Sequence, residues 1–83
     1  MFKYSFYDSK KYGTTKADAV EFVKHTNKPL KYTYGLKYRR PTTYEVPVTL
    51  EEAIDKIENH SLVDVDERED YVDINAYSDN DMW

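Results

Sequence analysis

The chain has 83 residues, a net charge of −4 and 40% hydrophobic residues, and it contains nine tyrosines. This length supports one domain with a thin core. The absence of cysteine excludes disulfides, thiolate catalysis and cysteine zinc sites. No apolar run approaches the roughly 20 residues of a membrane-spanning helix, and the first residues lack the apolar core of a signal peptide, so we expect a cytoplasmic protein.

The charges are distributed unevenly along the chain. Residues 1–43 contain ten Lys and Arg against three acidic residues, whereas residues 44–83 contain two against thirteen. If the two halves intermix in the fold, the opposite charges pair internally. If they stay apart, the acidic half forms a surface of its own.

The first residues predict a strand followed by a helix. Residues 1–7 alternate between two faces, as a strand does, and a polar connection ends at Gly13. Thr14 or Thr15 then caps a helix that ends near His25, and Asp18, three residues after Thr15, comes close to the capping-box pattern. The apolar side chains on its inner face are Ala19, Val20, Phe22 and Val23.

Strict alternation over residues 30–38 predicts a second strand. Leu30 and Leu36 mark its core face, and the three tyrosines of the segment share that face. The other face carries Lys31, Thr33, Gly35 and Lys37. A short strand over 43–48 returns, and Pro47 places it at a sheet edge.

The second half predicts a helix followed by a hairpin. Thr49 and Glu52 match a capping box that begins the helix. Its apolar side chains are Leu50, Ala53, Ile54 and Ile57. Residues 62–66 and 71–77 are typical of two strands, joined by a charged turn over 67–70.

The order of the predicted elements is β-α-β-β-α-β-β. This order indicates the α+β fold class, with a largely antiparallel sheet and two helices on one face. It is related to the split βαβ arrangement with one extra strand. We expect a single domain over 1–78 and a short acidic tail over 79–83.

The C-terminal hairpin predicts an acidic sheet face studded with tyrosine. Its valines alternate with acidic residues, which therefore point to solvent. No lysine is interspersed in the hairpin, although like charges on neighbouring strands destabilise a sheet. The predicted partner-binding residues are Asp64, Asp66, Glu69, Asp70, Tyr71, Asp73, Tyr77 and Trp83.

Three interpretations of this face remain open. The carboxylates keep a small domain in solution, or they complement a basic groove on another protein, where they stand in for phosphates and the aromatic residues anchor the contact. In the third, Asp64, Asp66 and Asp73 hold a hard cation. Neither a glycine loop nor regular ligand spacing supports a metal site, so we expect no metal and no cofactor.

The segment 30–40 interleaves aromatic and basic residues, as surfaces that stack bases do. Its alternation favours core packing of the tyrosines instead. The alternative function is a nucleic-acid-binding module that uses the basic half, including Lys10 and Lys11. Its principal contacts would be Lys31, Lys37, Tyr38, Arg39 and Arg40.

No pattern predicts an enzyme. His25 and His60 each end a predicted helix, where a partial positive charge meets the last carbonyls. Gly13 and Gly35 are the only glycines, and neither belongs to a phosphate-binding loop or a nucleophile elbow. We therefore expect no catalytic residues.

The chain is short, acidic, rich in tyrosine and free of cysteine. In these properties it resembles small counter-defence proteins of bacteriophages and mobile elements. The resemblance extends to two segments, YTYGLKYRRPTTYEVPVTLEEA and INAYSDNDMW. Anti-CRISPR proteins and DNA-mimic inhibitors belong to this group. The resemblance implies a non-enzymatic inhibitor that occupies the basic groove of a nucleic-acid-handling host protein, such as a CRISPR effector, in the host cytoplasm.

Overall fold

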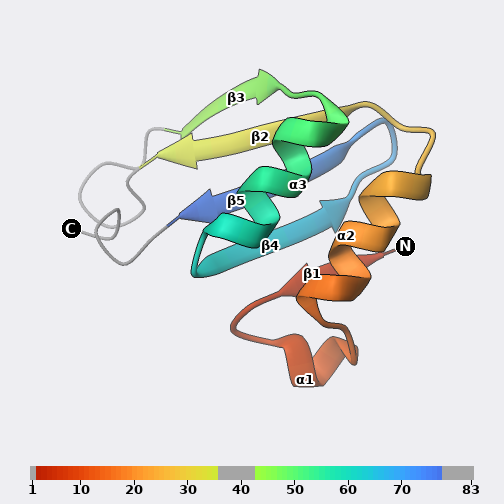
Figure 1. Cartoon of the computed structure of the whole chain (residues 1–83), viewed down its shortest axis with the longest axis vertical. Coiled ribbons are helices and arrows are strands. Elements are labelled where there is room, and N and C mark those ends of the chain that lie inside the picture. The colour runs from red at the N-terminus through yellow and green to blue at the C-terminus, as the bar shows by residue number, and fades with distance from the viewer. Residues whose placement is uncertain (1, 36–42, 78–83) are drawn as a thin grey trace.

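The computed structural model describes residues 2–35 and 43–77 (Figure 1). The predicted segments 36–42 and 79–83 lie outside this part of the chain. The elements in chain order are β1 (Lys3–Ser5), α1 (Ser9–Tyr12), α2 (Lys16–His25), β2 (Leu30–Gly35), β3 (Thr43–Pro47), α3 (Leu50–Asn59), β4 (Leu62–Glu67) and β5 (Val72–Tyr77). The predicted α+β class is confirmed.

The described strands form one sheet in the order β1-β4-β5-β2-β3. Neighbouring strands are antiparallel except for β5 and β2, which are parallel. The sheet is therefore mixed, where a largely antiparallel one was expected. The C-terminal hairpin β4–β5 lies between β1 and β2, which consequently run in the same direction (Figure 1). Its two strands therefore occupy inner positions of the sheet.

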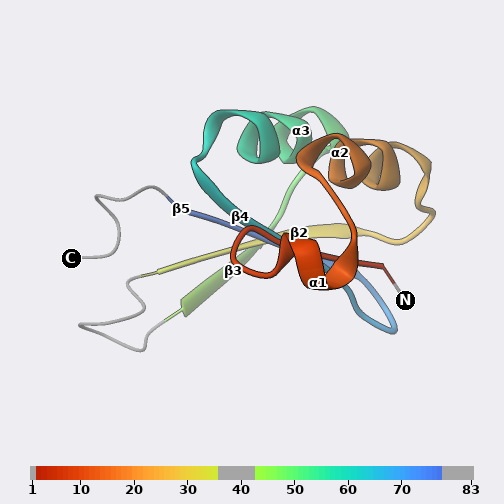
Figure 2. The same cartoon turned by 90° about the horizontal axis from the view of Figure 1, so that it is seen from below.

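Helices α2 and α3 lie side by side on one face of the sheet, as predicted (Figure 2). Both begin with the predicted capping box: the Thr15 hydroxyl accepts from the amide of Asp18, and the Thr49 hydroxyl accepts from that of Glu52, each at 3.2 Å. Neither these helices nor α1 has the length and apolar character to cross a membrane.

The core lies between the two helices and the inner face of the sheet. Its fully buried side chains include Val63 and Val65 of β4 and Val72 and Ile74 of β5, which confirms the predicted rows of the hairpin. Tyr32 packs against this core, and its hydroxyl donates to the carbonyl of Ala76 at 3.0 Å. Within the aromatic–basic segment, Tyr32 therefore packs against the core, as the alternation favoured.

Two local features differ from the predictions. The expected polar connection before Gly13 contains the one-turn helix α1, which ends where Gly13 adopts a left-handed φ of 67°. Leu50 is 41% exposed, although it was expected on the buried face of α3. It is the first residue of that helix, and helical side chains lean toward the N-terminus, so its side chain projects beyond the helix start.

Candidate functional site

The sheet face opposite α2 and α3 carries polar side chains on each of the central strands. One cross-strand row runs from Lys3 through Asp66 and Asp73 to Lys31. The acidic pair in its middle is thus flanked by a lysine on each side. We refer to this surface as the open face.

The basic and acidic halves of the chain intermix on this face. Insertion of β4–β5 between β1 and β2 places lysines from the first half beside carboxylates from the second. At one end of the sheet, Lys28 forms an ion pair with Glu67 at 2.8 Å. The hairpin itself contains no lysine, but lysines of β1 and β2 flank its acidic face. The sequence did not predict these flanks, because the pairing of the hairpin with β1 and β2 is non-local and leaves no local sequence signal.

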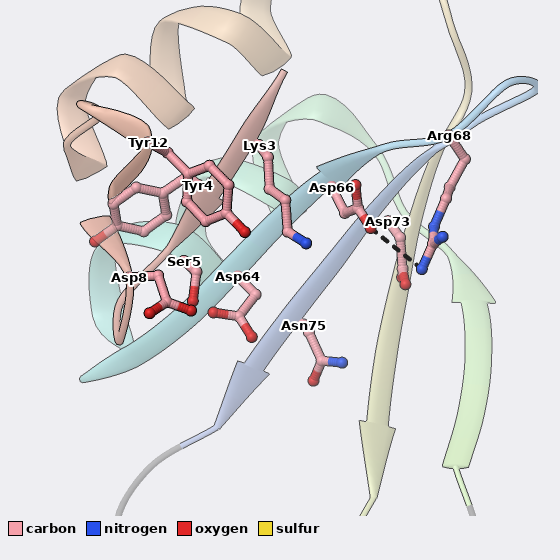
Figure 3. A pocket seen from close by; sticks show the side chains of 10 residues that line it. All are labelled: Lys3, Tyr4, Ser5, Asp8, Tyr12, Asp64, Asp66, Arg68, Asp73 and Asn75. Atoms are coloured by element: carbon pink, nitrogen blue, oxygen red, sulfur yellow. Dashed lines mark ion pairs between the residues drawn. The ribbon is translucent and has the colours of Figure 1, made fainter. Parts of the chain in front are cut away.

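A pocket of about 220 Å³ opens on this face (Figure 3). Strands β1, β4 and β5 form its floor, and the segment around α1 closes one side. The residues that line it are Lys3, Tyr4, Ser5, Asp8, Tyr12, Asp64, Asp66, Arg68, Asp73 and Asn75. In this view Asp8, Ser5 and Asp64 lie at one end, and Arg68 lies with Asp66 and Asp73 at the other (Figure 3).

The carboxylates of the pocket have different partners. Asp66 forms an ion pair with Arg68 at 3.2 Å, and Asp73 accepts a hydrogen bond from the Thr33 hydroxyl. Asp64 accepts from the backbone amide of Phe6 at 3.3 Å, and Asp8 makes no capping bond to α1. Among the described residues, the ion pairs include neither Asp8 nor Asp64.

Tyr12 supplies an aromatic wall beside these carboxylates. The ammonium groups of Lys3 and Lys11 lie 5.4 and 5.6 Å from its ring centroid, within the range of cation–π attraction. The neighbouring Tyr4 is buried, and burial, with a further effect of the Asp64 charge, raises the pKa of its hydroxyl. Tyr4 also lines the pocket.

The predicted partner-binding residues are only partly brought together. Asp64, Asp66 and Asp73 line the pocket, whereas Glu69 and Asp70 are exposed in the turn between β4 and β5. The Tyr71 ring lies under the Lys31 ammonium at 4.4 Å. The side chain of Tyr77, and Trp83, lie outside the described part of the chain.

Of the five predicted nucleic-acid contacts, only Lys31 lies within the described residues. Lys31 lies on the open face beside Asp73 rather than on a separate basic surface. The remaining four residues of that prediction, 37–40, lie outside the described ranges. Lys10 and Lys11 are exposed on α1.

The interpretation of Asp64, Asp66 and Asp73 as a metal site also finds no support. Within residues 2–35 and 43–77, no cluster of three or more His, Asp or Glu side chains could hold a metal ion. Sequence reasoning missed the contributions of Ser5, Asp8, Tyr12 and Arg68 to the pocket. Alternation alone placed Lys3 and Ser5 on one face of the first strand, but nothing local indicated that β1 pairs with β4.

Comparisons of the chain with models of protein families, with curated proteins and with solved structures find no match.

Proposed function

We propose that this chain is a non-enzymatic binding protein that docks its open face on a positively charged surface of another protein. The observation that supports this most directly is the pocket, which collects carboxylates from three separate segments on a sheet face that α2 and α3 leave uncovered. Four carboxylates face two cationic residues there, so a local negative charge remains.

The position of this charge favours a partner with a basic groove. The carboxylates are concentrated on the central strands β4 and β5, and the lysines lie on the strands that flank them. The negative centre complements a groove lined by Lys and Arg. We infer a nucleic-acid-handling protein as the partner, which this chain would inhibit by occupying the groove, in the manner of phage counter-defence proteins.

The proposal is tested by capture of proteins from a cell lysate on the immobilised full chain. We expect retention of a nucleic-acid-binding protein that is released by added duplex DNA or by high salt, since both weaken contacts to a basic groove. A variant with Asp64→Lys, Asp66→Lys and Asp73→Lys should lose this capture while keeping its circular dichroism spectrum. A second variant with the same residues changed to Asn tests the site with a smaller perturbation.

A matched control reverses three exposed carboxylates on the helices, Glu21, Glu51 and Glu58, to Lys and so makes the same change in net charge. This control should retain the partner. Equal capture by the open-face variant and the control would contradict the proposal. A mobility shift of labelled DNA by the chain alone, at low salt, would favour the alternative of a nucleic-acid-binding module.

A further inference from the structure

We propose that the pocket binds the guanidinium group of an arginine side chain that the partner inserts. This inference rests on the proposed function, because it identifies the chemical group by which a positively charged partner is recognised. The occupant is a side chain of the partner's basic surface.

The charges of the pocket favour a cationic group. Asp66 is neutralised by Arg68 at 3.2 Å, but Asp8 and Asp64 have no ion pair among the described residues. Both line the same pocket. A cation placed between them gains attraction from two carboxylates that the fold itself leaves without a positively charged partner.

The hydroxyl of Ser5 provides a second indication of a ligand. Ser5 is 8% exposed and lines the pocket. No hydrogen bond within the described part of the chain involves its side chain. No buried side-chain polar atom of the described residues lacks a hydrogen-bond partner, so the unpaired Ser5 hydroxyl is reached by solvent from the pocket, and a donor from a bound group could take the place of water there.

The arrangement of the acceptors favours guanidinium over a compact cation. The acceptors come from different segments: Ser5 from β1, Asp8 from the start of α1, and Asp64 and Asn75 from β4 and β5. Within the described part of the chain, these side chains do not form a cluster that could hold a metal ion. Guanidinium carries five donors spread over a rigid plane, whereas an ammonium group concentrates its donors at one point.

Two neighbouring contacts show that the surroundings suit this group. Arg68 already pairs with Asp66 on the same face, and the Tyr12 ring attracts the ammonium groups of Lys3 and Lys11. Guanidinium stacks on aromatic rings as well as pairing with carboxylates. The volume of about 220 Å³ is more than ten times the roughly 10–15 Å³ needed by one water, so a side-chain end fits.

The test is a titration of the full chain with N-acetyl-arginine amide, followed by the backbone amide signals in nuclear magnetic resonance spectra. We expect saturable shifts at Ser5, Asp64 and Asn75 with a dissociation constant on the order of 1 mM, as is usual for a fragment of this size. N-acetyl-citrulline amide has nearly the same shape without the charge, and it should produce no saturable shifts.

Single substitutions distinguish the pocket from general charge attraction. Asp8→Asn and Asp64→Asn should each weaken arginine binding by roughly fivefold or more, as expected for a lost charge-assisted contact. Lys3→Gln should strengthen it by about twofold, because it removes a like charge from the pocket. Glu51→Gln, an exposed carboxylate on α3, is the control and should leave binding unchanged. The same spectra show whether each variant is folded.

Arginine binding that is absent, equal to that of citrulline, or equally weakened by Glu51→Gln would overturn the inference. If capture of a DNA-released partner persists in that case, the proposed function stands and only the arginine pocket is wrong. Arginine binding without any captured partner would instead overturn the proposed function.

Discussion

Glu67, the last residue of β4, connects three segments that are distant in sequence. Its carboxylate accepts hydrogen bonds at 2.8 Å from the backbone amide of Phe2 and from the Lys28 ammonium. Lys28 also donates to the carbonyl of Arg68 at 2.8 Å. The bond from Lys28, followed by that from Phe2, lowers the pKa of Glu67 below its ordinary value of 4.5. This single side chain therefore ties the N-terminal strand to the central hairpin.

We predict that Glu67→Gln lowers the free energy of unfolding at pH 7 and that this difference shrinks as the pH falls. The folded pKa lies below the unfolded one, so the carboxylate stabilises the fold fully above pH of about 4.5, and the contribution is lost as the pH drops through the folded pKa. Urea midpoints of both proteins at pH 7, 5 and 3 measure this. Glu69→Gln, in the exposed turn, serves as the control. A difference between wild type and Glu67→Gln that stays constant with pH would contradict the prediction.

At the scale of elements, helix starts were the most predictable feature and the short helix α1 the least. Thr15 with Asp18 and Thr49 with Glu52 are local patterns that need no tertiary information, and both form as predicted. Helix α1 has four residues and no buried side chain, so hydrophobic periodicity could not reveal it. Because α1 holds Tyr12 against the open face, the side of the candidate site that Tyr12 forms could not be predicted from the sequence either.

We predict that Thr49→Ala reduces the free energy of unfolding by about 1 kcal/mol, because it removes the acceptor for the Glu52 amide at the start of α3. Thr49→Ser keeps a hydroxyl at the same position and should restore most of this loss. Thermal unfolding followed by far-ultraviolet circular dichroism compares the three proteins. If the serine variant is as unstable as the alanine variant, the cap is not the cause.

At the scale of the molecule, alternation predicted which face each strand buries but not which strand lies beside which. Val65 and Ile74 are buried as their spacing indicated, since side-chain parity is a local property. The insertion of the hairpin between β1 and β2 depends on pairings such as Tyr4 with Val65 and Tyr32 with Ile74, which join residues far apart in the chain. The mixed charge of the open face follows from those pairings and could not be read without them.

This insertion predicts that the whole sheet unfolds as one unit. Ile74 lies on β5, opposite Val65 of β4 on one side and Tyr32 of β2 on the other, and it is fully buried. Ile74→Ala should therefore lower the free energy of unfolding by roughly 2–5 kcal/mol, in a single transition that is the same in far- and near-ultraviolet circular dichroism. Val46→Ala, on edge strand β3 where the side chain is 37% exposed, should cost less than about 1 kcal/mol. Separate transitions in the two signals would show that the segments on either side of β5 fold independently, contrary to the interleaved topology.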